Sequence, residues 1–207
     1  MIAIVDYGVG NLYSLRSSLE VLGLESVVTH EADALSAADQ VILPGVGAFG
    51  DAMEKLNQTG LAEVVRSLAK QGKPLLGICL GMQLLFNTSH EFGLHQGLGL
   101  ISGEICPLED DLRAAGFSYK VPHMGWNPLR FIKQNCPLLK ASEAGEYVYY
   151  VHSYYAKYCD SSLVATSEYG VAVPGVVQAG KVFGTQFHPE KSGAVGLRML
   201  KAFSEVR

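Results

Sequence analysis

Residues 74–86 read PLLGICLGMQLLF, and this stretch decides how the chain can fold. The apolar run Leu75–Cys79 is typical of a buried strand, and Gly81–Phe86 begins a helix. Between them, the pattern Gly-Ile-Cys-Leu-Gly matches a sharp strand-to-helix turn in which a nucleophile, here Cys79, projects above the sheet edge. The positive end of the helix favours the reactive thiolate. Since a free cysteine is most often a buried structural residue, Cys79 becomes a candidate nucleophile only if the chain also supplies a base.

Outward from this turn, the first half of the chain alternates strand and helix patterns. Three further strands are predicted, at Ile2–Val5, Ser26–Thr29 and Gln40–Leu43, the last closed by Pro44-Gly45. Two helices are predicted from apolar residues at helical spacing, at Leu12, Leu15, Leu19 and Leu22 and at Leu61, Val64, Val65 and Leu68, ended by Gly23 and Gly72. Strands alternating with helices favour a parallel sheet covered on both faces.

The second half favours short strands separated by glycine and proline. They are predicted at Tyr147–Val151, Ser162–Thr166, Val171–Gln178 and Val182–Phe187, and a last helix spans Val195–Val206. We therefore expect one α/β domain over residues 1–207, with a central, mostly parallel sheet flanked by helices and antiparallel strands added at one side.

The composition excludes several classes of protein. The chain has 207 residues, of which 48% are hydrophobic and 17% are charged, so it is neither a disordered chain nor a coiled coil. Its net charge of −4 gives no basic surplus to neutralise phosphates, which disfavours a nucleic-acid partner. Soluble domains carry about 25% charged residues, so the low value here suggests that part of the surface meets a partner instead of water.

Membrane, secretion and metal signals are absent from the sequence. The N-terminal MIAIVDYGVG has no signal-peptide pattern, and the longest nearly apolar run, Pro74–Phe86, is too short to span a membrane. The four cysteines include no Cys-x-x-Cys pair, so we expect no metal site and no disulfide framework. A cytoplasmic protein without a cofactor fits these features best.

A candidate base lies in the segment TQFHPEKS at residues 185–192. His188 follows a predicted strand, and Glu190 comes two residues later, within reach of the same imidazole. A cysteine nucleophile needs a base, and the base needs a group that orients it. Alone, this His-x-Glu would be a solvated loop; with the turn at Cys79 it completes a Cys-His-Glu set.

Three segments together resemble the signatures of the class I, or triad-type, glutamine amidotransferases. They are PGVGAFG at 44–50, GICLGMQLL at 77–85 and TQFHPEKS at 185–192, in the family's order and spacing. The resemblance implies that Cys79 attacks the side-chain amide of glutamine and forms a thioester. It implies that His188 transfers the protons and that Glu190 holds the imidazole in its working tautomer.

The same resemblance implies the groups that bind the substrate and the oxyanion. The Leu80 N–H and a peptide flip at Val46, within Gly45-Val46-Gly47, would supply the oxyanion donors. Gln83, Ser153 and Tyr154 match positions that bind the glutamine. The flexibility of the Gly45-Val46-Gly47 strand suggests that the isolated subunit is nearly idle until a partner sets the oxyanion hole.

Three further segments resemble one branch of the family, the glutaminase subunits of imidazole glycerol phosphate synthase. They are DYGVGNL at 6–12, VPHMGWN at 121–127 and YVYYVHSY at 147–154. The resemblance implies a (β/α)8-barrel cyclase as partner, in a heterodimer. Ammonia would pass through that barrel and yield imidazole glycerol phosphate and an aminoimidazole carboxamide ribotide (AICAR), in histidine biosynthesis. The glycine turn at 6–12 lacks the third glycine and the Lys-Ser/Thr of phosphate-binding loops, so we interpret it as a tight turn.

Five residues are expected to face this partner: Asn11, Trp126, Tyr149, His152 and Lys191. Tyr149 is four residues from Ser153 and would line the ammonia exit, while Lys191 directly follows Glu190. The alternatives are core packing for the aromatic residues and a solvated surface position for the lysine. His123 and His152 lack a carboxylate two residues on, so we interpret them as interface or hydrogen-bonded structural histidines.

Other functions are compatible with parts of this pattern. An ammonia donor for anthranilate or pyridoxal phosphate synthesis is disfavoured by VPHMGWN. A non-catalytic subunit on the same fold would not need Cys79, His188 and Glu190 together. A peptidase-like hydrolase is disfavoured by Gln83 and the oxyanion glycines.

Overall fold

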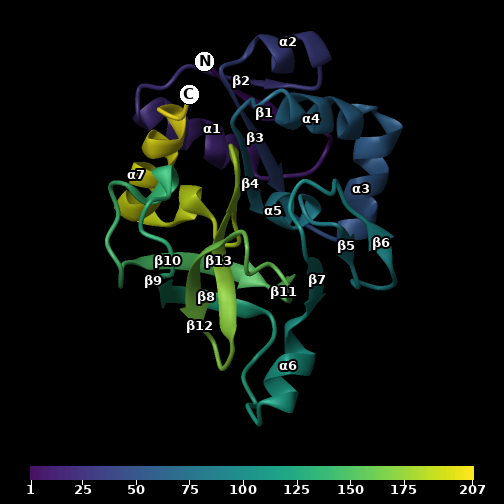
Figure 1. The fold of residues 1–207 in the computed structure, drawn as a ribbon. Helices are drawn as coiled ribbons and strands as arrows, with labels where there is room; N and C mark the ends of the chain where they lie inside the picture. Colours follow the sequence, from purple (N-terminus) through teal and green to yellow (C-terminus); the bar gives the residue numbers. More distant parts are fainter.

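An eight-stranded sheet forms the centre of the molecule (Figure 1). The computed structural model describes residues 1–207. From edge to edge, the strands are β2 (Ser26–Thr29), β1 (Ile2–Val5), β3 (Gln40–Gly45), β4 (Leu75–Cys79), β14 (Val182–Thr185), β13 (Ala172–Ala179), β12 (Leu163–Glu168) and β9 (Arg130–Phe131). The strands from β2 to β14 run parallel, and β13, β12 and β9 are added antiparallel. The predicted fold class is therefore confirmed.

Neighbouring residues of the central strands face opposite layers of helices. In β3, Val41 and Leu43 pack into one core and Ile42 packs into the other. The first core is covered by α2 (Ala32–Ala37), α3 (Phe49–Gln58) and α4 (Leu61–Lys70), and the second by α1 (Leu12–Val21) and α7 (Gly193–Ser204). Because both faces of a parallel sheet are buried, its strands are almost purely apolar, as in Ile2–Val5.

Two smaller sheets lie beside the central one. In the first, β8 (His123–Pro128) pairs antiparallel with β10 (Tyr147–His152), and we call this pair the β8–β10 ribbon. The second has the order β11 (Tyr154–Lys157), β7 (Glu104–Pro107), β5 (Thr88–Ser89), β6 (His95–Gln96). The remaining helices are α5 (Leu80–Leu84), α6 (Leu108–Ala114) and the 3-10 turns η1 (Pro137–Leu139) and η2 (Pro189–Lys191).

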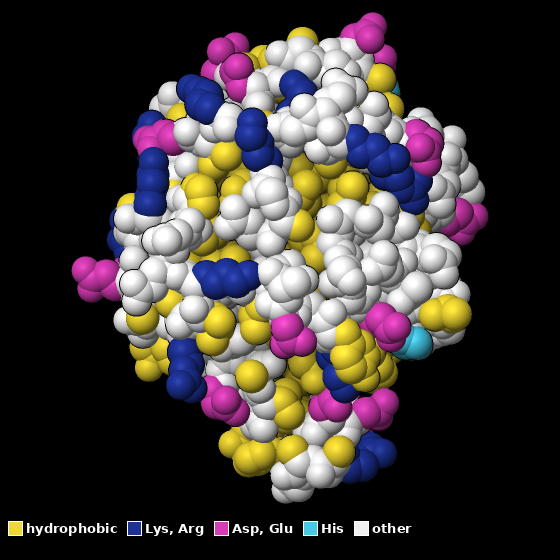
Figure 2. Space-filling view, viewed as in Figure 1, with side chains coloured by type: hydrophobic (Ala, Val, Ile, Leu, Met, Phe, Trp, Pro, Cys, Tyr) yellow, Lys and Arg dark blue, Asp and Glu magenta, His cyan; other side chains and the backbone are white.

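The visible surface mixes charges of both signs. Figure 2 shows Lys and Arg side chains interspersed with Asp and Glu, and apolar side chains at the lower end, where Figure 1 places α6. Phe117 and Tyr119, which follow α6, are exposed and their rings lie 5.1 Å apart. No helix in the structure is both long and apolar enough to cross a membrane.

Most predicted strands and helices are confirmed, with differences at their ends. β3 continues through Pro44 to Gly45, because both residues still lie in register with β4. β14 ends at Thr185 and not at Phe187, although the Gln186 N–H still donates to the Gly175 carbonyl of β13 at 3.0 Å. The helices α2, α3 and α6 were not predicted, and α6 lies in the second half of the chain, where only short strands and the last helix were expected.

The turn from β4 into α5 depends on two glycines with no room for a side chain. A Cβ at Gly77 would lie 2.6 Å from the Gly81 carbonyl oxygen, and a Cβ at Gly81 would overlap the Leu43 carbonyl oxygen of β3. Backbone atoms cannot move aside as a flexible side chain can. The glycines therefore let α5 begin in direct contact with two strands, which fixes the position of Cys79.

We predict that Gly81→Ala lowers the free energy of unfolding by about 3 kcal/mol or more, because the new methyl group overlaps the backbone of β3. The matched control is Gly23→Ala, where φ is +66° but the space is open, and there a loss of only about 1 kcal/mol is expected. Urea unfolding measures both. Equal losses in the two variants would contradict this description of the turn.

Candidate active site

Cys79 is the last residue of β4 and directly precedes α5. Its φ of +55° and ψ of −114° are unusual for a residue with a side chain, and they turn the thiol out of the sheet. The side chain is only 7% exposed. On either side, Gly45 of β3 lies in register with Cys79, and Thr185 of β14 lies in register with Ile78. The cysteine therefore sits between two strand ends at the carboxyl edge of the sheet.

His188 and Glu190 lie on the segment that follows β14. The His188 Nδ1 is 2.7 Å from the Glu190 Oε1, and both side chains are less than 5% exposed. The His188 N–H donates to the Tyr149 carbonyl at 3.0 Å, while the Ser192 hydroxyl donates to the His188 carbonyl at 2.7 Å. Backbone contacts on both sides thus fix the imidazole relative to β10.

The charge on His188 is set by its two neighbours. Burial alone lowers the pKa of His188, but hydrogen bonds to Cys79 and Glu190, and the charges of both, raise it to about 9. The imidazole is therefore protonated at neutral pH and faces Cys79 on one side and Glu190 on the other. A protonated imidazole that is held by a carboxylate beside a cysteine is the partner that a cysteine nucleophile requires.

The backbone beside Cys79 comes from two segments, the start of α5 and the residues that follow β3. The first N–H groups of a helix have no partner within it, so the Leu80 N–H is available. Gly47 has a φ of +92°, and Val46 is 42% exposed. The Tyr7 hydroxyl donates to the Pro44 carbonyl at 2.8 Å and anchors the end of β3, just before these two residues. Val46 and Gly47 both line the pocket that contains Cys79.

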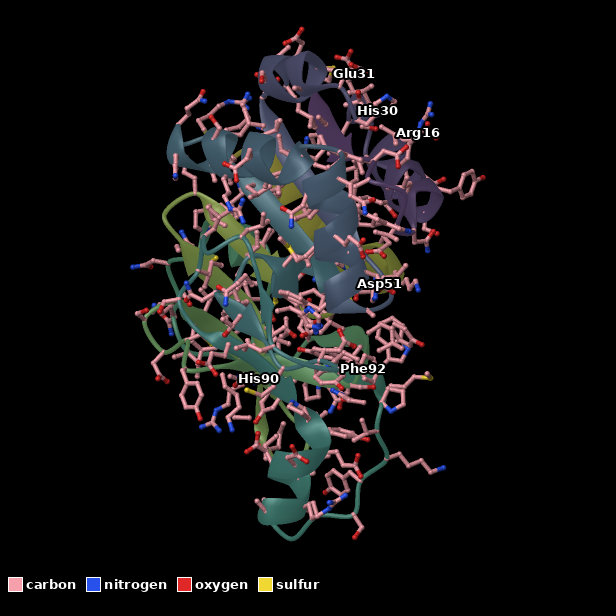
Figure 3. All side chains as sticks on the ribbon, turned by 90° about the vertical axis from the view of Figure 1, so that its right-hand side faces the viewer. Arg16, His30, Glu31, Asp51, His90 and Phe92 are labelled. Carbon is pink, nitrogen blue, oxygen red and sulfur yellow. The ribbon has the colours of Figure 1, made fainter.

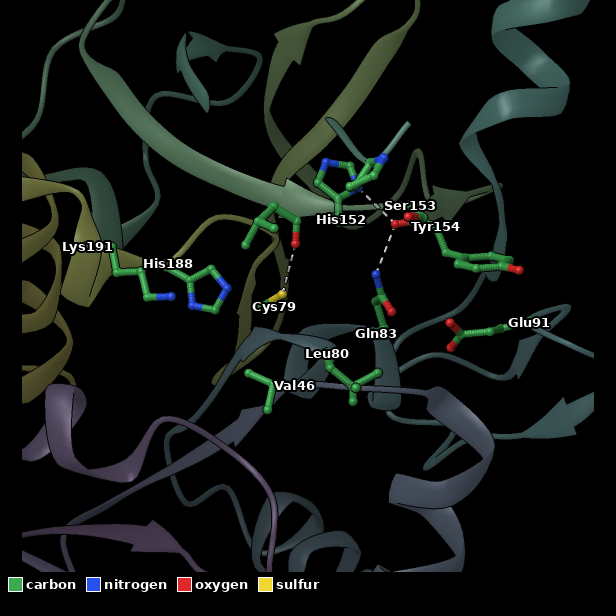
Figure 4. A pocket seen from close by; sticks show the side chains of 13 residues that line it. Val46, Cys79, Leu80, Gln83, Glu91, His152, Ser153, Tyr154, His188 and Lys191 are labelled. Carbon is green, nitrogen blue, oxygen red and sulfur yellow. Dashed lines mark hydrogen bonds between the residues drawn. The ribbon is translucent and has the colours of Figure 1, made fainter. Parts of the chain in front are cut away.

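A pocket of about 420 Å³ opens above Cys79 (Figure 4). In this view Cys79 lies in the middle, with His188 on one side and Gln83 and Glu91 on the other. Its lining residues are Val46, Gly47, Cys79, Leu80, Gln83, Glu91, Pro122, Val151, His152, Ser153, Tyr154, His188 and Lys191. The volume suits a small polar molecule such as an amino acid.

The side-chain amide of Gln83 is held by hydrogen bonds to two acceptors. Its Nε2 donates to the Tyr154 carbonyl at 2.9 Å and to the Gln186 Oε1 at 3.0 Å. Because both N–H groups are used, only the amide oxygen of Gln83 remains to accept a hydrogen bond from a ligand. Gln186 is fully buried, and its Nε2 lies 3.9 Å from the Cys79 Sγ.

Two polar residues of the site were missed by the sequence analysis. Gln186 lies within the segment that was quoted for His188 but received no role. Glu91 has no local pattern that marks it; its carboxylate accepts the Phe49 N–H of α3 at 2.6 Å and lines the pocket. Burial raises the pKa of Glu91, while the Phe49 N–H and His95 oppose the shift. Its acidic group can accept a cationic ligand group.

The two faces of the β8–β10 ribbon have different characters. Outward-facing residues alternate along both strands and are mostly apolar: Met124, Trp126, Pro128, Tyr147, Tyr149 and Val151. Trp126 is 52% exposed, and its ring meets Tyr149 at a centroid distance of 5.8 Å. Because Val151 also lines the pocket, this outer face reaches its mouth, where Lys191 lies as well.

The inner face of the ribbon carries a buried histidine pair. The His123 Nδ1 lies 2.9 Å from the His152 Nε2, and the His152 Nδ1 lies 2.9 Å from the Tyr154 carbonyl oxygen. Burial lowers the pKa of His123, and burial together with His123 lowers that of His152 to about 3, so both are neutral. Of the two interpretations offered for His152, the structure favours the hydrogen-bonded one, since its side chain faces inward.

Asn11 is the N-terminal cap of helix α1. Its side-chain oxygen accepts the Ser14 N–H at 3.3 Å and caps α1. It borders a small cavity together with Val46 and Glu190. Its contacts therefore lie between the start of α1 and the active-site loops.

Comparison with known proteins places this geometry in a family. A sequence model described as "Glutamine amidotransferase class-I" matches residues 3–205. A Geobacillus kaustophilus protein named "Imidazole glycerol phosphate synthase subunit HisH" is 54% identical over 204 residues, covering 98% of this chain and 95% of that protein. A protein of the same name from Listeria monocytogenes is 49% identical over 206 residues, covering 100% of this chain and 96% of that protein.

Solved structures share the fold at lower identity. One titled "Crystal structure of glutamine amidotransferase" superposes with a TM-score of 0.74 at 18% identity, covering 99% of this chain and 100% of its own. A chain from the structure of PurLQS from Thermotoga maritima superposes with a TM-score of 0.74 at 22% identity, covering 98% of this chain and 96% of its own. With the buried Cys79 and His188 at one end of a parallel sheet, these matches show that the chain belongs to the class I glutamine amidotransferase family.

Proposed function

We propose that this chain is the glutaminase subunit of an imidazole glycerol phosphate synthase. It hydrolyses glutamine to glutamate and ammonia and passes the ammonia to a separate cyclase subunit. The observation that carries the proposal is the Cys79–His188–Glu190 set at the end of a pocket that suits one amino acid. Relatives with that function are about half identical over nearly their whole length.

The chemistry follows from the positions of the groups. The Cys79 thiolate attacks the side-chain carbonyl carbon of glutamine and forms a C–S bond, and the carbonyl oxygen becomes an oxyanion. The His188 imidazolium gives its proton to the amide nitrogen, and ammonia leaves as the thioester forms. Neutral His188 then takes a proton from water, which attacks the thioester. Glutamate departs, and the thiolate–imidazolium pair is restored.

The backbone beside Cys79 would stabilise the oxyanion. The Leu80 N–H is one donor, and a peptide of Gly45-Val46-Gly47 is the second once it points into the pocket. Removing one donor of this kind from an enzyme costs about 100- to 1000-fold in kcat. The partner would complete this hole by selecting that peptide orientation, so the isolated chain is expected to be nearly idle.

The far side of the pocket fits the amino-acid end of glutamine. Glu91 supplies a carboxylate for the α-ammonium group, and the Gln83 oxygen is free to accept a hydrogen bond. The backbone of Ser153 and Tyr154 borders the same space and would hold the α-carboxylate. In this orientation, the side-chain amide of the bound glutamine points toward Cys79.

The outer face of the β8–β10 ribbon is the surface that we assign to the barrel-shaped cyclase. Exposed Trp126 and half-buried Tyr149 form an apolar patch that continues to the pocket through Val151. Large exposed apolar patches on soluble proteins commonly mark interfaces. Ammonia released at Cys79 would leave beside Tyr149, with Lys191 at the mouth. Asn11 and His152 would support this interface indirectly. Asn11 caps α1 beside the active-site loops, and His152 lies on the inner face of β10.

The ammonia drives the cyclase reaction that yields imidazole glycerol phosphate and AICAR in histidine biosynthesis. All four cysteines are free thiols, which fits a reducing compartment. We therefore place the protein in the cytoplasm, with residues 1–207 as one glutamine amidotransferase domain.

Replacement of the nucleophile tests the proposal directly. In the complex with the cyclase, Cys79→Ala is expected to abolish glutamine-dependent formation of imidazole glycerol phosphate, while ammonium salts still support it. Cys136→Ala makes the same change at a buried thiol away from the pocket and is expected to retain both activities. Loss of the ammonia-dependent reaction together with the glutamine-dependent one in Cys79→Ala would overturn the nucleophile assignment.

A second prediction concerns pH. Since the pKa of His188 is raised to about 9, the imidazolium is present below that pH and is lost above it. The kcat/KM for glutamine in the complex should therefore fall as the pH rises through about 9.

Glu190→Gln removes one interaction that raises this pKa, so the fall should move to lower pH. Glu54→Gln, at an exposed position on α3, should leave the profile unchanged. An identical midpoint in Glu190→Gln and the unmodified protein would refute the role of Glu190.

A further inference from the structure

Three side chains that favour metals meet where β5 ends beside β7. In this parallel pair, Thr88 lies in register with Glu104 and Ser89 with Ile105. The next residue, His90, continues the pairing, because its N–H donates to the Ile105 carbonyl at 2.9 Å. Residues two apart on a strand share a face, so His90, Glu104 and Cys106 project on the same side.

The distances between these side chains suit a common ligand. The His90 Nε2 lies 2.9 Å from the Glu104 Oε2, and one donor atom from each of the three residues lies within 4.8 Å of the others. A tetrahedral zinc ion, with bonds of about 2.0 Å to nitrogen and oxygen and 2.3 Å to sulfur, holds its ligands about 3.3–3.5 Å apart. Small side-chain rotations therefore bring the three donors to a shared ion.

We propose that His90, Glu104 and Cys106 form a binding site for a divalent zinc-type ion, separate from the active site. Imidazole, carboxylate and thiolate are the three ligand types that zinc takes from proteins. Three protein ligands leave a fourth position for water. The spacing of the cysteines along the sequence does not reveal this site, because two neighbouring strands contribute its ligands.

The surroundings of Cys106 favour a cation. Glu104, Asp110 and Asp111 place negative charge near the Cys106 thiol. The opposing cation, Lys157, already contacts both oxygens of Asp111 at 2.8 Å. A bound metal ion supplies the missing positive charge and converts the thiol to its thiolate.

The Thr88 hydroxyl is a further polar group beside the three proposed ligands. The Thr88 Oγ1 is buried without a hydrogen-bond partner, and Thr88 lies in register with Glu104 on the same face. Buried polar atoms are normally paired. This oxygen is available to an ion or to water bound on it.

The site would stabilise the segment that carries Glu91. His90 directly precedes Glu91, whose N–H donates to the Ser89 hydroxyl at 3.2 Å and whose carboxylate holds the start of α3. An ion joining His90 to β7 fixes the end of β5. It therefore restrains Glu91 without touching the pocket itself.

The test is a titration with cobalt(II), whose bond to a thiolate absorbs in the near ultraviolet. The full chain is used, reduced and freed of metal by a chelator, in a Cys79→Ala background so that the active-site thiol cannot bind. Zinc then competes for the cobalt site. Cys106→Ser and His90→Gln remove one ligand each.

The control is His30→Gln. His30 and Glu31 form an exposed pair with the same 2.9 Å separation, but near the upper end of the molecule, far from His90 (Figure 3), and without a cysteine in the group. This variant separates binding to the proposed site from weak binding to any exposed histidine–carboxylate pair.

The expected result is one cobalt ion per chain with the thiolate absorption, displaced by one equivalent of zinc. Cys106→Ser should abolish the absorption, and His90→Gln should weaken binding at least about 10-fold, since even a residue that only supports a ligand contributes that much. His30→Gln should change nothing. The proposal is overturned if no thiolate absorption appears, if it persists in Cys106→Ser, or if His30→Gln weakens binding as much as His90→Gln.

Discussion

The backbone at Cys79 is the constraint on which the rest of the site depends. A residue with a side chain at φ +55° and ψ −114° costs about 1–3 kcal/mol relative to a relaxed conformation. The sheet holds it there because β4 pairs with β3 and β14 on its two sides, and Gly77 and Gly81 let α5 start against them. The strain places the thiol outside the sheet, within reach of His188.

The β8–β10 ribbon links the pocket to the surface that we assign to the partner. Its inner face holds His152, which contacts the Tyr154 carbonyl that also accepts from Gln83. Its outer face exposes Trp126 against Tyr149. The Tyr149 carbonyl in turn accepts the His188 N–H. A partner bound to the outer face therefore contacts the strand that holds His188 and, through the shared Tyr154 carbonyl, is linked to Gln83.

Much of this arrangement follows from the sequence. The sheet could be predicted because its strands are short apolar runs. Cys79 could be predicted because it ends such a run at a Gly-x-Cys-x-Gly turn, and His188 because it follows one. The helix α6 was missed since only Leu108 and Leu112 are buried, too few to show a period. Glu91 depends on a contact with the start of α3, and the cluster of His90, Glu104 and Cys106 on the pairing of two strands. No local pattern records such contacts, so only the fold reveals them.

In the proposed reaction, Cys79 forms a covalent intermediate with the side chain of glutamine. It is tested most directly by quenching the complex with acid during glutamine turnover and mapping the peptides by mass spectrometry. We expect an adduct with the mass of a glutamyl group on the peptide that contains Cys79, absent after treatment with hydroxylamine. An adduct on Cys106, Cys136 or Cys159, or turnover without any adduct under conditions that preserve thioesters, would contradict it.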